Sequence, residues 1–173
     1  MNRRTAYLAL IALLLLSGPR VASAQRDGRG GRFEDDLIAK LEGNWTLTRQ
    51  IRGTESKNTV SASWVLQHQF LLLRMRDVAI PSRYEADVYI GYSYAANEYV
   101  AHWIDNFGGH FSGTGRGKRN GNSVEFRFEY PDGPFFNTFS WDPGSGTWNC
   151  HLESVAKDGT RQTFARDSLA RAP

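Results

Sequence analysis

The chain has 173 residues, of which 40% are hydrophobic, 13% are aromatic and one is cysteine. This length is typical of a single domain, and a single cysteine excludes an intrachain disulfide, so a hydrophobic core must stabilise the fold. The formal net charge of +3 is small, and it excludes the strongly basic field with which many proteins attract nucleic acid.

The first 24 residues have the three parts of a secretory signal peptide. Arg3 and Arg4 precede an apolar run from Ala6 to Leu16, and Ala22-Ser23-Ala24 supplies small residues at the expected cleavage site. The run is shorter than the roughly 20 residues that span a bilayer. We therefore predict a periplasmic or secreted protein with no membrane span after cleavage. An uncleaved membrane anchor is the alternative interpretation.

The basicity of the whole chain belongs to this N-terminal segment. Residues 1–24 contain three Arg and no acidic residue, so the mature chain has 18 basic and 18 acidic residues. We therefore predict no nucleic-acid partner, and we interpret the basic cluster at 116–119 as a solvated hairpin tip. Residues 25–32 contain no apolar residue and predict a disordered lead-in. One domain follows at 33–168, with a short tail at 169–173.

Residues 33–41 predict one short helix. Phe33, Leu37 and Leu41 recur at a spacing of four, acidic residues follow Phe33, and Gly43 comes after the last turn. The remaining chain shows alternation of apolar and polar residues between turn residues, which is typical of strands. The expected strands are residues 45–52, 60–66, 70–78, 84–94, 99–105, 111–117, 124–130, 135–141, 148–155 and 160–166. A meander of about ten strands predicts an all-β fold, an antiparallel β-barrel, because closure removes exposed sheet edges.

Several short motifs resemble those of known barrels. Gly43-Asn44-Trp45 is similar to the Gly-x-Trp opening of calycin barrels, the lipocalin and fatty-acid-binding group. The ordered set across residues 41–167 resembles a bacterial lipocalin-like family of unknown function. Its members here are Gly43-x-Trp45, Trp64-Val65-Leu66, Phe70-Leu71, Tyr89-Ile90-Gly91-Tyr92, Tyr99-Val100 and Trp103-Ile104-Asp105-Asn106.

This resemblance implies a lipocalin-like barrel in which Trp45 seals one end and packs on a basic residue of the last strand, Arg161 or Arg166. It implies no catalytic residues. The chain departs from the family where Gln67-His68-Gln69 replaces a Gly-rich turn, and it lacks the Gly-rich first strand of the related heme-binding nitrobindin barrels. We therefore predict no heme and no other cofactor.

A barrel of this size has room for its own side chains or for one small ligand. We predict a small apolar or amphipathic ligand, lined by Trp64, Arg74, Tyr92, His102, Trp103 and Asp105. Arg74 would bind a carboxylate head group inside the barrel or be solvated outside it, and the alternation leaves both open. Asp105-Asn106 either presents polar groups at the barrel mouth or forms an Asx turn.

Two other classes of function stay open. His102 and Asp105 could form the acid–base pair of a hydrolase or isomerase, although no Ser or Cys nucleophile motif accompanies them. A barrel filled by its own aromatic residues would instead be a structural or interaction protein. His102 and His110 match no metal signature, so we predict no metal site. Cys150 shares a strand face with Trp148 and Leu152, which predicts a buried thiol.

Overall fold

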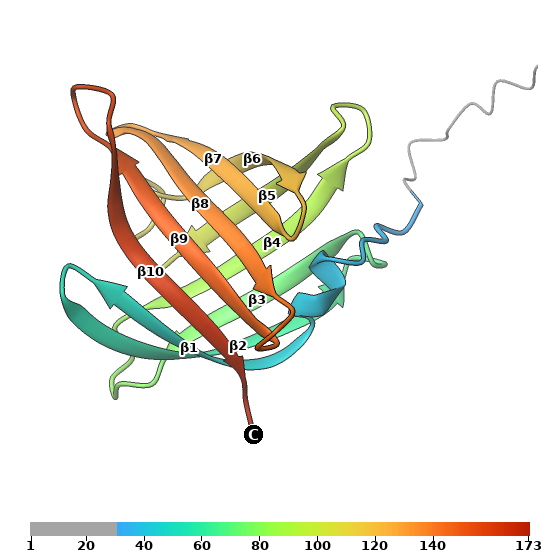
Figure 1. Cartoon of the computed structure of the whole chain (residues 1–173), viewed down its shortest axis with the longest axis horizontal. Coiled ribbons are helices and arrows are strands. Elements are labelled where there is room, and N and C mark those ends of the chain that lie inside the picture. The colour runs from blue at the N-terminus through green and yellow to red at the C-terminus, as the bar shows by residue number, and fades with distance from the viewer. Residues whose placement is uncertain (1–30) are drawn as a thin grey trace, which may run out of the picture.

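Ten antiparallel strands close into a barrel in the computed structural model, which describes residues 31–173 (Figure 1). Each strand pairs with the next along the chain, and the last pairs with the first. The strands are β1 (Gly43–Ile51), β2 (Thr54–Val65), β3 (Phe70–Asp77), β4 (Glu85–Ser93), β5 (Glu98–Asp105), β6 (Gly113–Asn120), β7 (Ser123–Tyr130), β8 (Gly133–Asp142), β9 (Thr147–Val155) and β10 (Arg161–Arg171). The predicted fold class, an all-β antiparallel meander barrel, is confirmed.

Two predictions concern residues at the N-terminus. The expected signal peptide, residues 1–24, and residues 25–30 of the expected lead-in lie outside the described residues. Gly31 and Arg32 are described, and both contact the barrel: Gln69 donates a hydrogen bond to the Gly31 carbonyl, and Arg32 lies 2.9 Å from a ring nitrogen of His68. Among residues 31–173, no helix is both long enough and apolar enough to span a membrane.

The predicted helix over residues 33–41 is shorter than expected. Only η1 (Ile38–Leu41), a single turn of 3-10 helix, forms. The reason is tertiary, because the backbone N–H of Phe33 donates to the His68 carbonyl at 2.9 Å and so holds the start of the segment against the turn between β2 and β3. The Asp35 carboxylate then accepts the backbone N–H groups of Leu37 and Ile38, at 2.9 and 2.7 Å, which starts the short turn.

Side chains alternate between the lumen and the outer surface along the strands, apart from an irregularity between Thr163 and Ala165 in β10. Aromatic rings fill much of the lumen. Phe126, Phe128, Phe139 and Trp148 are almost completely buried. The Gly-rich strand β6 makes room for them: a Cβ atom at Gly115 would lie only 2.6 Å from the Phe128 ring. The glycines of this strand therefore let the rings of β7 pack close to its backbone.

The segment that contains η1 closes one end of the barrel (Figure 1). Trp45 lies beneath it and donates its indole N–H to the Leu41 carbonyl at 2.7 Å. The basic partner of Trp45 is Arg171, whose guanidinium carbon lies 3.9 Å from the ring centroid. The expectation of Arg161 or Arg166 was wrong, because β10 continues to Arg171, three residues beyond the expected end of the domain.

The same arginine explains the glycine of the Gly-x-Trp motif. Gly43 has a φ of +118°, and a Cβ atom there would lie 2.2 Å from a guanidinium nitrogen of Arg171. Arg171 also donates to the carbonyls of Glu42 and Lys40, at 2.6 and 3.2 Å. One arginine of the last strand therefore fixes both the turn into β1 and the ring of Trp45.

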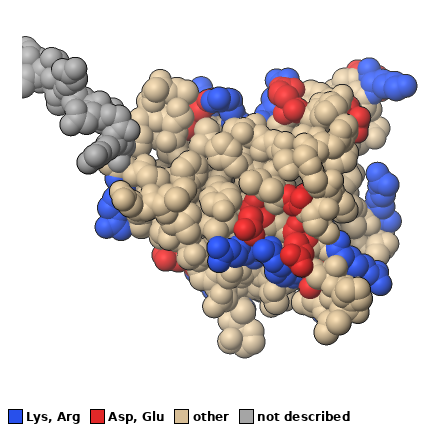
Figure 2. Space-filling view, turned by 180° about the vertical axis from the view of Figure 1, so that it is seen from behind, with Lys and Arg blue, Asp and Glu red and all other residues tan. Residues whose placement is uncertain are grey.

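The basic cluster at 116–119 lies within β6 rather than at its hairpin tip, and its arginines are paired. Arg116 forms an ion pair with Glu98, and Arg119 donates to both carboxylate oxygens of Asp36, at 2.5 and 3.2 Å. In Figure 2, which shows the molecule from behind, acidic and basic side chains lie next to one another. Charges of one sign form no continuous field on that face.

Candidate functional site

Four polar side chains are buried among the described residues, and all four occupy lumen-facing positions of their strands. They are Arg49 on β1, Asn58 on β2, Asn137 on β8 and Asp167 on β10, and none is more than 9% exposed. Their strand neighbours at the alternate positions are apolar: Leu47 precedes Arg49, Val60 follows Asn58, and Phe139 follows Asn137. We call these four residues the polar lumen layer.

Arg49 and Asp167 form a buried ion pair within this layer. They are cross-strand partners on β1 and β10, and the guanidinium donates twice to the carboxylate, at 2.8 and 2.6 Å. Burial lowers the pKa of Arg49, but the hydrogen bond and the charge of Asp167 outweigh that effect and hold the pKa above its usual value. The pair is electrically neutral, so Arg49 is not a free cation for a ligand carboxylate.

The guanidinium of Arg49 also reaches an aromatic group that precedes β4. Its central carbon lies 5.3 Å from the ring centroid of Tyr84, and the Tyr84 hydroxyl accepts the indole N–H of Trp103 at 3.1 Å. Burial raises the pKa of Tyr84. Burial also raises the pKa of Asp105, the last residue of β5, against the opposing effect of its hydrogen bond from the Phe107 backbone N–H. These groups therefore favour their protonated forms more than solvated groups would.

The two asparagines of the layer are not fully satisfied. The side-chain oxygens of Asn58 and Asn137 are buried and have no hydrogen-bond partner. Asn58 lies between Leu47 and Asp77, and Asn137 lies between Phe126 and Leu152. The apolar neighbours have no donor, and an aspartate carboxylate accepts hydrogen bonds, so no strand neighbour supplies a donor side chain. A buried carbonyl oxygen without a donor costs roughly 1–3 kcal/mol. Both oxygens are therefore acceptors available to a donor group inside the lumen.

The structure does not bring the predicted lining residues together. Trp64 and Tyr92 lie at the η1 end, where their rings contact Phe33 at centroid distances of 5.7 and 5.8 Å. Trp103 and Asp105 lie on the lumen-facing side of β5, toward the other end. The remaining two, Arg74 and His102, occupy outward-facing positions of β3 and β5.

Arg74 lies on the outer surface, where 57% of its side chain is exposed and its nearest acid, Asp87, is 3.8 Å away. A carboxylate-binding role for Arg74 inside the lumen is therefore wrong. His102 is also on the outside: its Nδ1 atom lies 2.9 Å from the Thr114 hydroxyl, and its ring contacts Phe70. His102 and Asp105 point to opposite faces of β5, so they do not form an acid–base pair.

The Asp105-Asn106 stretch is an Asx turn that links two loops. Asp105 accepts the Phe107 backbone N–H at 3.0 Å. Asn106 accepts the Glu85 backbone N–H at 3.2 Å and donates to the Arg83 carbonyl at 3.1 Å. Of the two interpretations of this stretch, the Asx turn is the one that the contacts support.

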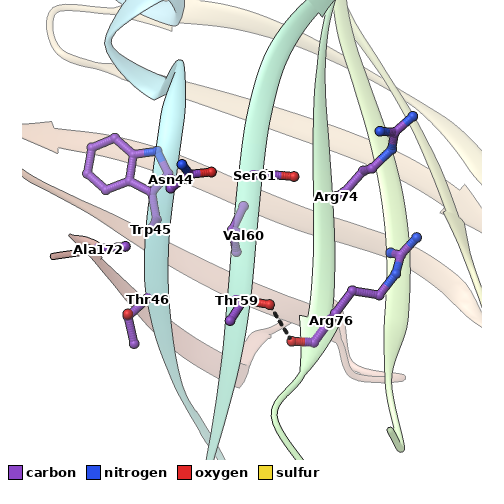
Figure 3. A pocket seen from close by; sticks show the side chains of 9 residues that line it. All are labelled: Asn44, Trp45, Thr46, Thr59, Val60, Ser61, Arg74, Arg76 and Ala172. Atoms are coloured by element: carbon purple, nitrogen blue, oxygen red, sulfur yellow. Dashed lines mark hydrogen bonds between the residues drawn. The ribbon is translucent and has the colours of Figure 1, made fainter.

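Two hollows among the described residues lie away from the polar lumen layer. The larger, about 380 Å³, lies over β1 to β3 and is lined by Asn44, Trp45, Thr46, Thr59, Val60, Ser61, Arg74, Arg76 and Ala172 (Figure 3). Arg76 at its edge already donates to the Ala86 carbonyl and to Asp87, both at 3.1 Å. The smaller, about 170 Å³, lies between residues 33–35 and β4–β5. Neither hollow contains a residue of the polar lumen layer.

The part of the chain that the structure describes offers few side chains for metal binding or for a reactive thiol. No three His, Cys, Asp or Glu side chains gather there closely enough to hold a metal ion. Cys150 is buried, as predicted, and burial raises the pKa of its thiol well above the ordinary value. A thiol in that state is a poor nucleophile, because the thiolate is the reactive form.

Comparison with known proteins gives a fold and no family. No protein-family model matches the chain, and a search of curated proteins finds no match. Among solved structures, the chain is similar to Rv2717c from M. tuberculosis, with a TM-score of 0.54 and 13% sequence identity, over 79% of this chain and 95% of that one. A likeness at this level of identity supports the barrel fold alone.

Proposed function

We propose that this protein is an exported binding protein that holds a small, mostly apolar molecule in the barrel lumen. The observation that carries the proposal is the polar lumen layer, because two of its amide oxygens are buried without a donor. An unpaired buried acceptor is costly in a protein that uses its lumen only for packing. It becomes useful where a bound molecule supplies the donor.

The ligand would reach this layer from the end of the barrel that lies opposite η1. The η1 end is blocked by Phe33, Leu37, Ile38 and Leu41, which are buried over Trp45. Near the polar layer the lumen wall includes the small side chain of Ala86 and the flexible side chain of Met75, which are cross-strand partners on β4 and β3. A methionine can change its conformation to admit a guest more easily than a branched residue can.

We also propose that the chain is a distant relative of the calycin barrels. The support is the contact between Trp45 and Arg171, together with the glycine that this contact requires. Export to the periplasm or beyond, and the loss of residues 1–24, belong to the same proposal and rest on the signal-peptide pattern.

Native mass spectrometry of the protein purified from an exported fraction tests the proposed function. We expect a mass above that of the processed chain, and solvent extraction should release a small apolar molecule. A mass equal to that of the chain alone, unchanged after incubation with lipid and metabolite mixtures, would reject the proposal.

That negative result would support a second function, a structural or interaction barrel with a filled core. The observation in its favour is the packing of Phe126, Phe128, Phe139 and Trp148 inside the lumen. An enzyme that uses His102 and Asp105 receives no comparable support, because these residues face opposite sides of β5.

A further inference from the structure

We infer that the head group recognised in the lumen is a neutral hydrogen-bond donor, of which a primary amide is the simplest form. The inference rests on the proposed lumen binding and deepens it by naming the ligand chemistry. It identifies Asn58 and Asn137 as the residues that recognise the head group, through their unpaired side-chain oxygens.

The charges around the layer select against an ionised ligand. The cation of the layer, Arg49, already makes two hydrogen bonds to Asp167. A carboxylate placed there would meet unpaired carbonyl oxygens and would find no uncommitted cation of the layer to neutralise it. A buried charge without a partner is far more costly than a buried neutral polar group. An ammonium group could donate to the same oxygens, but the carboxylate of the layer, Asp167, is committed to Arg49 and would not neutralise its charge.

The hydrogen-bonding capacity of the lumen favours a ligand with donors. Asn58 and Asn137 each present an acceptor oxygen without a donor. Trp148 has a buried indole N–H without an acceptor, but it lies opposite Trp141, four residues along β8 from Asn137, and is not counted with the two oxygens. A primary amide carries two N–H donors, so it can donate to an asparagine oxygen without bringing a charge into the lumen.

Isothermal titration calorimetry on the whole protein tests this inference with four probes of equal chain length: octanamide, octan-1-ol, octanoate and octylamine. We expect octanamide to bind tightest and octan-1-ol next, with octanoate and octylamine weaker than octanamide by at least about tenfold. Octanoate or octylamine binding as tightly as octanamide would overturn the inference and leave lumen binding intact. Failure of all four probes, with a bare mass in the native spectrum, would reject the proposed function itself.

Substitutions identify the recognising atoms. Asn58→Leu and Asn137→Leu should each weaken octanamide binding by about tenfold, because each replaces an acceptor by an apolar side chain of similar volume. The matched control is Asn149→Leu, since Asn149 is exposed on the outer face of β9 and should leave binding unchanged. Circular dichroism melting establishes that each variant is folded, and Asn→Ala at the same position, which also removes the acceptor, replaces any leucine variant that is not folded. Octanamide affinity that is unchanged in folded variants of both positions would overturn the inference.

Discussion

The two ends of the barrel solve the problem of closure in different ways. At the η1 end the chain supplies its own plug, in which Phe33, Leu37, Ile38 and Leu41 bury apolar surface against the lumen wall. The polar groups of this end have partners: the exposed Asp36 pairs with Arg119, and the partly buried Asp35 accepts the Tyr99 hydroxyl at 2.5 Å. At this end, the apolar side chains that bury surface are thus distinct from the polar side chains that hold the segment to the strands.

The other half of the lumen buries polar groups more deeply, and some of them have no partner. Arg49 and Asp167 are paired inside the barrel, and two asparagine oxygens are buried in the lumen without donors. A core built for stability alone gains nothing from such groups, because apolar residues of similar volume would often be at least as stable. The difference between the ends therefore indicates that the plugged end serves the fold and that the polar lumen layer serves recognition.

The largest predicted effect on stability comes from the buried ion pair of the polar lumen layer. Asp167→Leu leaves the Arg49 guanidinium buried without its partner, and we expect the free energy of unfolding in urea to fall by about 3–5 kcal/mol. The double variant Arg49→Leu/Asp167→Leu should recover most of that loss, because no unpaired charge remains.

The matched control for this prediction is an ion pair of the same chemistry on the outer surface. Arg161 and Glu125 are about 40% exposed and 2.7 Å apart, so Glu125→Leu should cost less than about 1 kcal/mol. Equal losses for Asp167→Leu and Glu125→Leu would show that the lumen is hydrated and that the layer is not buried in solution.

The plugged end should respond to loss of apolar volume instead. Leu37→Ala removes a completely buried side chain, and we expect the free energy of unfolding to fall by about 3 kcal/mol, within the usual range for such cavities. Glu34→Ala in the same segment is the control, because 70% of the Glu34 side chain is exposed and its loss should change stability by less than about 0.5 kcal/mol. A small effect of Leu37→Ala would mean that the plug contributes little to the fold.

The barrel could be predicted from the sequence because strand periodicity and turn residues are local signals. Each strand alternates its side chains with period two, and glycine, asparagine and aspartate mark the connections between strands. The short helix was over-extended because a tertiary hydrogen bond, from Phe33 to His68, overrides the local pattern of residues 33–41. Helical spacing of apolar residues carries no information about such a contact.

The site was harder to predict, because alternation groups residues by face without showing which face is the lumen. Arg74 shares its face with Leu72, which is only 3% exposed although it lies on the outer surface. An apolar neighbour therefore did not reveal where Arg74 points. Arg49 did carry a signal: it interrupts the apolar face that Trp45 and Leu47 begin, and an arginine at such a position requires a buried partner. Its partner Asp167 is 118 positions away, which no local pattern reveals.

The smallest predicted effect is a dependence of stability on pH, which tests how strongly the lumen excludes water around Asp105. Burial raises the folded-state pKa of Asp105 above its unfolded value. The folded state therefore binds this proton more tightly than the unfolded state does. The free energy of unfolding is highest below the unfolded pKa of Asp105, and it falls as the pH rises through the unfolded and then the folded pKa. Asp105→Asn should unfold at a higher urea concentration than the wild type at pH 7, by less than about 1 kcal/mol, and the two should converge at acidic pH.

Asp158, in the turn between β9 and β10, gives a control of opposite sign. Hydrogen bonds from the Thr160 hydroxyl and backbone N–H lower the pKa of Asp158. Its contribution to stability is present above the unfolded pKa and is lost as the pH falls through the folded one, so Asp158→Asn should be less stable than the wild type at pH 7. Urea midpoints measured from pH 3 to pH 7 show whether each variant is more or less stable than the wild type. Destabilisation of both variants at pH 7 would show that Asp105 is solvated, and that the lumen around it is not the weakly hydrated environment on which recognition of a neutral ligand depends.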